Sequence, residues 1–77
     1  MANKENYVQC DMKDQDWHVH TAWIPKSFAK VNKKIRIDSY YPDTIWTIIA
    51  CWESKDAEFV ESHARDYKNA YPSIQEI

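Results

Sequence analysis

The chain of 77 residues contains no glycine, and this absence constrains every tight turn that the backbone can make. Glycine adopts positive φ more readily than any other residue, so turns that need this conformation must here use residues with side chains. Asparagine tolerates the left-handed region better than most residues, and aspartate hydrogen-bonds readily to nearby backbone amides. We therefore expect Asn32 to occupy a left-handed turn position and residues 13–16 to form a turn that aspartate stabilises.

Length and composition predict one small globular domain. A chain this short has room for a single hydrophobic core, and a content of 44% hydrophobic and 29% charged residues argues against wholesale disorder. Residues 1–10 contain no apolar run of the kind found in a secretory signal, and the uncharged stretch 44–52 is too short for a membrane-spanning helix. We therefore expect a soluble protein that does not contact membranes.

A two-residue period of apolar side chains predicts four strands in the first two-thirds of the chain. The expected strands are residues 7–13, 17–24, 34–38 and 44–52. The last is apolar on both faces, which is typical of a central strand that is covered on both sides. On the second strand, the period places on one face Trp17, Val19, Thr21 and Trp23. We expect most of the tryptophan side chains to lie in the core. The four tryptophans are Trp17, Trp23, Trp46 and Trp52.

The spacing of apolar residues changes to three and four after residue 54, which is the period of a helix. We expect a helix within residues 54–71, capped by Ser54 or Asp56 and stopped by Pro72. The element order predicts an α+β, mostly β domain. Residues 7–53 would form a small SH3-like, partly open barrel or a curved four-stranded antiparallel sheet, with the single C-terminal helix packed on it. The two ends, residues 1–6 and 72–77, are expected to be flexible.

The cysteines and histidines are the candidate residues for metal binding and catalysis. The possible donors for a tetrahedral zinc site are Cys10, His18, His20 and Cys51. The spacing of these residues matches no zinc-binding pattern. We therefore expect no metal and no other cofactor. His63 and Asp66 are expected to form a simple pair on the helix surface. A glycine-rich phosphate loop is impossible without glycine, so we expect neither enzymatic activity nor a small-molecule substrate.

Basic and aromatic residues are the candidates for partner binding. The net charge is −2, yet five of the ten cationic side chains lie between residues 26 and 36. Exposed aromatic residues beside a basic strand can anchor a protein partner or stack on nucleic-acid bases. The candidate partner-binding residues are the loop tyrosines Tyr40 and Tyr41 and the cations Lys30, Lys33, Lys34 and Arg36.

Several segments of the chain, in order, resemble a group of small uncharacterised bacteriophage proteins. They begin with residues 7–10, continue with Trp23-Ile24-Pro25 and the basic stretch to residue 37, and include a tryptophan-led strand, residues 46–51. A possible C-terminal motif follows, formed by Arg65, Asp66, Tyr67 and Lys68, and the last matching segment is residues 73–77. The glycine that precedes Lys33 in the group is Asn32 here. The resemblance implies a phage origin and a shared fold rather than an activity.

These observations lead to one functional hypothesis and two alternatives. The first is a non-enzymatic phage module that docks on a bacterial host protein, in the host cytoplasm, and modulates or inhibits it. The first alternative is a small nucleic-acid-binding barrel that uses the basic segment 26–36 for phosphate contacts. The second is a minor structural protein of the virion that associates through the edge strands of its sheet.

Overall fold

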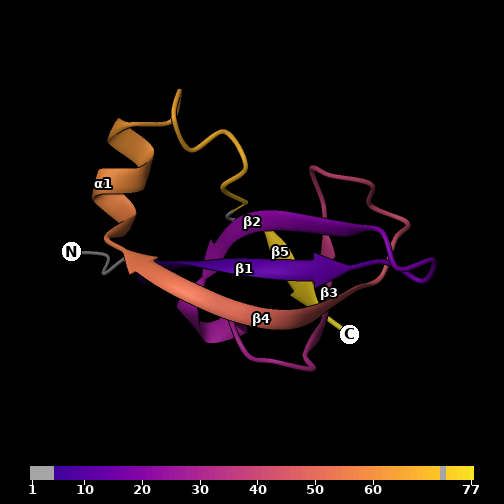
Figure 1. The fold of residues 1–77 in the computed structure, drawn as a ribbon. Helices are drawn as coiled ribbons and strands as arrows, with labels where there is room; N and C mark the ends of the chain where they lie inside the picture. The colour runs from indigo at the N-terminus through magenta and orange to yellow at the C-terminus, as the bar shows by residue number, and fades with distance from the viewer. Residues whose placement is uncertain (1–4, 72) are drawn as a thin grey trace.

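The computed structural model describes residues 5–71 and 73–77, which form a curved antiparallel sheet with one short helix (Figure 1). The strands are β1 (Tyr7–Lys13), β2 (Val19–Pro25), β3 (Lys34–Ile37), β4 (Trp46–Lys55) and β5 (Ile74–Glu76). A 3-10 turn, η1 (Lys26–Phe28), follows β2, and α1 (Ala57–Ser62) follows β4. The strand order is β2-β1-β4-β3-β5. The predicted α+β, mostly β class is confirmed, but the sheet has five strands instead of four and is not closed.

Strand β4 lies at the centre of the sheet, between β1 and β3, as its apolar composition predicted. Its pairing with β1 shifts register between Val8 and Cys10 and again between Asp11 and Met12. Such bulges bend a strand and increase its twist, which gives the sheet its curvature. The expectation of complete cover on both faces is wrong toward the end of the strand, where Trp52 is 62% exposed.

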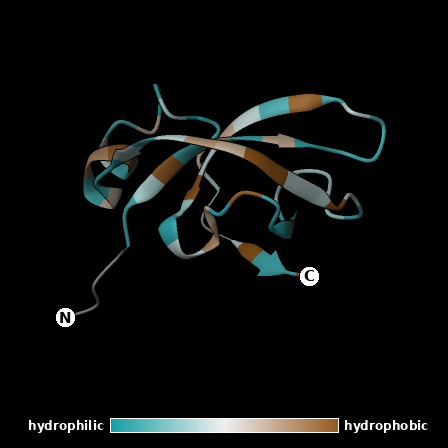
Figure 2. Ribbon diagram, turned by 60° about the horizontal axis from the view of Figure 1, so that its bottom comes forward, coloured by the Kyte–Doolittle hydropathy of each residue, from teal (hydrophilic) through white to brown (hydrophobic). Residues whose placement is uncertain are grey.

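The main core lies on one face of the sheet, and Figure 2 shows the hydrophobic residues as bands along the strands. Its buried members are Val8, Cys10, Met12, Ala22, Ile24, Ile35, Ile37, Trp46 and Ile48. On β2 it is Ala22 and Ile24 that face this core, so the face predicted from the alternation is wrong. The predicted second strand begins too early, because Trp17 has a positive φ of 64° and lies in the turn, where it is 67% exposed.

A second cluster lies on the opposite face, at the end of the sheet that α1 covers (Figure 1). Tyr7 and Trp23 point away from the main core because successive residues of a strand face opposite sides. They pack with Ala57 and Val60 of the helix. Of the four tryptophans expected in the core, Trp23 and Trp46 are therefore buried, whereas Trp17 and Trp52 are exposed.

Helix α1 is much shorter than the expected helix within residues 54–71. It begins at Ala57 and is capped by Asp56, one of the two predicted caps, whose carboxylate accepts a hydrogen bond from the Glu58 amide at 2.8 Å. It ends at Ser62, and turns follow. The helical spacing continued past this end because Tyr67 and Tyr71 are held by tertiary contacts: their rings lie 5.1 Å from Trp23 and 5.3 Å from Tyr40, respectively.

The C-terminal segment connects the two edge regions of the sheet. The Trp23 amide donates to the Asn69 carbonyl at 3.0 Å, and the Tyr71 amide donates to the Trp23 carbonyl at 2.9 Å. Beyond residue 72, which lies outside the described residues, β5 pairs antiparallel with β3, so that Ile74 faces Ile37. Residues 74–76 of the expected flexible tail therefore form a strand in the structure.

The predicted flexible N-terminus, residues 1–6, is described only at its last two positions. The Glu5 carboxylate accepts hydrogen bonds from the amide and the hydroxyl of Ser27, at 3.1 and 2.8 Å. The Asn6 carbonyl accepts a hydrogen bond from the Lys26 amide at 2.8 Å. These contacts tie both residues to η1, and residues 1–4 lie outside the described part of the chain.

Asn32 has the predicted left-handed conformation, with φ of 72°. Alanine tolerates the left-handed region less well than asparagine, whose short polar side chain can hydrogen-bond locally, so we expect Asn32→Ala to lower the free energy of unfolding by about 1 kcal/mol. The control is Asn32→Gly, which removes the same side chain but permits positive φ. Urea denaturation measures both, and equal stability of the alanine variant and the parent protein would contradict this account.

Strand β5 should contribute to stability through Ile74, which is half-buried against the main core. We expect Ile74→Ala to lower the free energy of unfolding by about 1–2 kcal/mol, less than for a fully buried isoleucine. The neighbouring exposed residue provides the control, and Gln75→Ala should change stability by less than about 0.5 kcal/mol. Thermal unfolding followed by circular dichroism measures the stability of both variants. If β5 were a loose tail, both variants would be as stable as the parent protein.

Candidate functional site: a cleft between two loops

Two loops at the end of the sheet away from α1 enclose a cleft of about 260 Å³ (Figure 1). The first loop joins β1 to β2, and the second joins β3 to β4. The residues that line this "loop cleft" are Asp14, His18, His20, Tyr41, Thr44 and Trp46. A smaller hollow of about 120 Å³ adjoins it, shares Asp14 and Thr44 with it, and adds Asp16 and Asp43. The loop cleft therefore contains three aromatic or imidazole side chains besides His18, and one carboxylate, and the adjoining hollow adds two more carboxylates.

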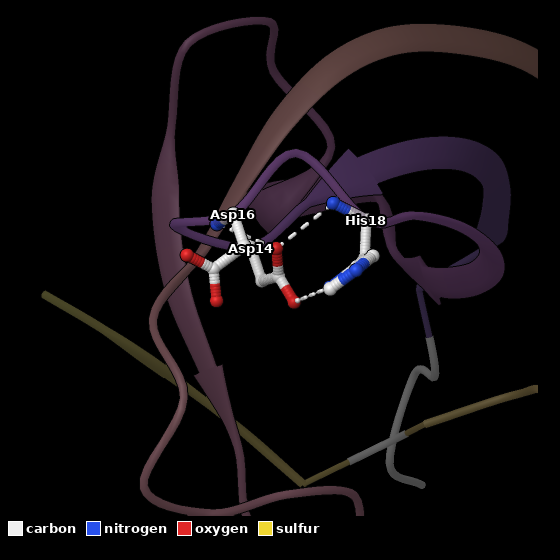
Figure 3. A group of neighbouring side chains, drawn as sticks. All are labelled: Asp14, Asp16 and His18. Atoms are coloured by element: carbon white, nitrogen blue, oxygen red, sulfur yellow. Dashed lines mark hydrogen bonds and ion pairs between the residues drawn. The ribbon is translucent and has the colours of Figure 1, made fainter.

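The carboxylate of Asp14 organises the first loop (Figure 3). One oxygen accepts hydrogen bonds from the amides of Asp16 and His18 at 2.8 and 2.9 Å. The other lies 3.0 Å from Nδ1 of His18. These bonds, the backbone bond from His18 above all, lower the pKa of Asp14. The expectation that aspartate stabilises this turn is confirmed.

Two of the rings that line the loop cleft, those of His20 and Trp46, pack with the ring of Tyr40. The Tyr40 hydroxyl lies 3.1 Å from Nδ1 of His20, and the Tyr40 ring stacks on Trp46 with centroids 5.7 Å apart. The rings of His20 and Trp46 meet edge to face at 5.1 Å. Tyr40 is thus half-buried and packed on the core, which corrects its interpretation as an exposed loop aromatic.

Each loop also carries one exposed aromatic residue: Tyr41 lines the cleft, whereas Trp17 lies in the first loop and is not one of the lining residues. Trp17 is 67% exposed and Tyr41 is 63% exposed, and both have positive φ, 64° and 50°. Bulky residues rarely adopt this conformation, and backbone strain of this kind is concentrated at functional sites. The structure keeps Tyr41 as a candidate binding residue and adds Trp17, which the sequence analysis had assigned to the core.

Trp46 carries a polar group that the protein leaves unsatisfied. Its side chain is 2% exposed, and its indole N–H finds no hydrogen-bond partner within the described part of the chain. A buried donor without a partner is destabilising and is uncommon in folded proteins. Because Trp46 also lines the loop cleft, this donor is a candidate contact for a bound group.

The basic candidates do not share one environment. Lys33 is largely covered, and its ammonium lies 3.2 Å from the carboxylate of Glu76 in β5. Arg36 is half-buried on β3, and its Nε is a buried group without a hydrogen-bond partner among the described residues. Lys30 and Lys34 are exposed. Only part of the predicted basic surface is therefore available for phosphate contacts.

The possible C-terminal motif lies in the turns that follow α1. Arg65, Asp66 and Lys68 are exposed, whereas Tyr67 packs edge to face on Trp23. The expected helix-surface pair between His63 and Asp66 is not the arrangement found, because the helix has already ended. The His63 ring instead stacks on Phe59 with centroids 4.3 Å apart.

The possible zinc donors are not brought together. Cys10 and Cys51 face each other across β1 and β4 with their sulfur atoms 3.6 Å apart, and burial raises the pKa of the Cys10 thiol. Neither histidine joins them, since His18 lies in the first loop and His20 packs against Trp46. Within residues 5–71 and 73–77, the group with three potential donor atoms in one place is Asp14, Asp16 and His18. These three residues occupy every second position of one turn, and this spacing is the sequence signal of the cluster.

Comparison with known proteins adds no relative. No family model, no curated protein and no solved structure matches the chain. The resemblance to bacteriophage proteins therefore stays a prediction. In the described part of the chain, no helix has the length and apolar character needed to cross a membrane.

The hydrogen bonds around Asp14 predict a measurable pH effect. Because its pKa is lower in the folded protein, Asp14 contributes stability that is fully present above its unfolded pKa and is lost as the pH falls through the folded value. We expect the carboxyl carbon of Asp14, followed by NMR, to titrate at lower pH in the native protein than in urea. Asp14→Asn should remove this part of the acid sensitivity, and identical native and unfolded titrations would contradict the turn geometry.

Proposed function

We propose that this protein is a non-enzymatic bacteriophage module that docks on a bacterial host protein through the loop cleft and modulates or inhibits it. The observation that carries the proposal is the pair of exposed aromatic residues, Trp17 and Tyr41, held in left-handed conformations on the two loops. Tryptophan and tyrosine are enriched among the residues that dominate binding energy at protein interfaces. The phage origin and the host partner follow from the sequence resemblance.

The charges around the loop cleft favour a protein partner over a nucleic acid. Asp14 lines the loop cleft, and Asp16 and Asp43 line the adjoining hollow. The charges of these three carboxylates would repel phosphate groups. The cation Lys33, a candidate for phosphate contact, is already paired with Glu76. Aromatic residues that stack on bases are normally accompanied by a positively charged groove, and that combination does not occur at this cleft.

A pull-down from bacterial lysate, with and without nuclease, tests the proposal. We expect one dominant host protein to remain bound after nuclease treatment. The double variant Trp17→Asn and Tyr41→Asn should lose at least about 90% of it, because single anchor residues at interfaces commonly contribute 2 kcal/mol or more (about thirtyfold in affinity). Asparagine is chosen because it removes each ring but still tolerates positive φ.

The matched control is Trp52→Asn, which removes a tryptophan that is 62% exposed on β4 and belongs to neither loop. It should retain the partner. Retention by the double variant would contradict docking through this cleft. Recovery of many nucleic-acid-associated proteins that disappear with nuclease would favour the nucleic-acid alternative and the exposed cations Lys30 and Lys34.

A further inference from the structure

We infer that Cys10 and Cys51 form a thiol pair that an external low-molecular-weight disulfide oxidises, reversibly, to a disulfide within the chain. The two residues are Cα partners on the neighbouring strands β1 and β4 (Figure 1), and both are free thiols in this structure. Their sulfur atoms lie 3.6 Å apart. The inference does not depend on the docking function, because the pair belongs to the sheet and to neither loop.

The position of the pair in the ladder suits a covalent bond between the two strands. On β2, the amide and the carbonyl of Trp23 point away from β1, since both are hydrogen-bonded to the C-terminal segment. Alternate residues of a strand direct their backbone groups to opposite sides, so the adjacent Ala22 directs its groups toward its β1 partner, Cys10. Cys10 in turn directs its backbone groups to β2, and it therefore faces Cys51 at a position without ladder hydrogen bonds.

The separation at such a position is compatible with a disulfide. Partners without ladder hydrogen bonds come closer than the hydrogen-bonded ones, with their Cα atoms about 4.5 Å apart. Disulfides usually join Cα atoms that are about 4.4–6.8 Å apart. The two side chains also lie on the same face of the sheet, because Cys51 packs against the main core that contains Cys10. The bond can therefore form while both strands keep their pairing.

Unequal exposure gives the two thiols different roles. Cys51 is half-buried, so an external disulfide can reach it, whereas Cys10 is 1% exposed. Burial raises the pKa of the Cys10 thiol, and the thiolate is the form that attacks a disulfide. Cys51 is therefore the residue that reacts first, and Cys10 is the residue that completes the bond.

The oxidant that the inference names is oxidised glutathione, and the exchange takes place in two steps. The Cys51 thiol loses its proton to water, and its thiolate attacks one sulfur of the oxidant. A mixed disulfide forms, the sulfur–sulfur bond of the oxidant breaks, and one glutathione thiolate leaves. Cys10 then loses its proton, and its thiolate attacks the Cys51 sulfur and displaces the second glutathione thiolate. The protein gives up two electrons to the oxidant, and the two released thiolates take up the two protons.

Reduced glutathione reverses both steps, so the state of the pair follows the redox balance around the protein. Cytosolic glutathione keeps most thiols reduced. We therefore expect the bond to be absent in a reducing cytosol and to form where oxidised glutathione accumulates.

The test is incubation of the folded full chain with oxidised glutathione, followed by intact mass spectrometry and thermal unfolding. We expect a monomer that has lost two hydrogen atoms and carries no glutathione. Because the bond joins residues 41 positions apart and restricts the unfolded chain, the melting temperature should rise by at least about 5 °C. An unchanged mass, a retained glutathione, a disulfide-linked dimer, or a melting temperature that does not rise would overturn the inference.

Two single variants test the order of the steps. Cys10→Ala should stop at the mixed disulfide and retain one glutathione, because the thiol that displaces it is missing. Cys51→Ser should stay unmodified in the folded state, because its remaining thiol is buried. Glutathione on Cys51→Ser but not on Cys10→Ala would overturn the assignment of Cys51 as the first thiol to react. The measurement on the parent protein decides the inference even if a variant fails to fold.

Discussion

Left-handed backbone positions that carry side chains are the constraint on which the rest of this structure depends. In the described part of the chain, positive φ occurs at Trp17, Asn32 and Tyr41, and a chain without glycine has no side-chain-free residue to put there. Each such position costs about 1–2 kcal/mol for an ordinary residue. Neighbouring contacts must offset that cost, and these contacts also shape the loops.

The contacts that offset this strain are local and specific. The Asp14 carboxylate receives two amide hydrogen bonds and fixes the turn that contains Trp17. The Thr44 amide donates to the Tyr41 carbonyl at 2.9 Å, and the Tyr41 ring lies 4.7 Å from the Tyr40 ring, which is itself packed on the core. The backbone at both exposed aromatic residues is therefore fixed by contacts within the protein itself. Preorganised side chains lose less conformational freedom on binding, so more of the contact energy appears as affinity.

The sequence predicted the features that arise from local patterns. The two-residue period located four of the strands, the composition of β4 indicated its central position, and the short polar side chains of Asn32 and Asp56 marked a turn and a helix start. The sequence did not predict the path of the chain after Ser62. There the spacing of Tyr67 and Tyr71 mimicked a helix, although these rings are placed by contacts with Trp23 and Tyr40 that are distant in sequence.

The candidate site shows the same division between local and distant information. Tyr41 was predicted from its loop position, and the turn at Asp14 from its residue types. Trp17 was missed as a loop residue because strict alternation assigned it to β2. The predicted exposure of Tyr40 was wrong because no local sequence pattern indicates its hydrogen bond to His20. The loop cleft forms only where the loop between β1 and β2 lies next to the loop between β3 and β4. Its lining is therefore a property of the folded sheet: the carboxylates of the cleft and the adjoining hollow come from both loops, and Trp46 comes from β4.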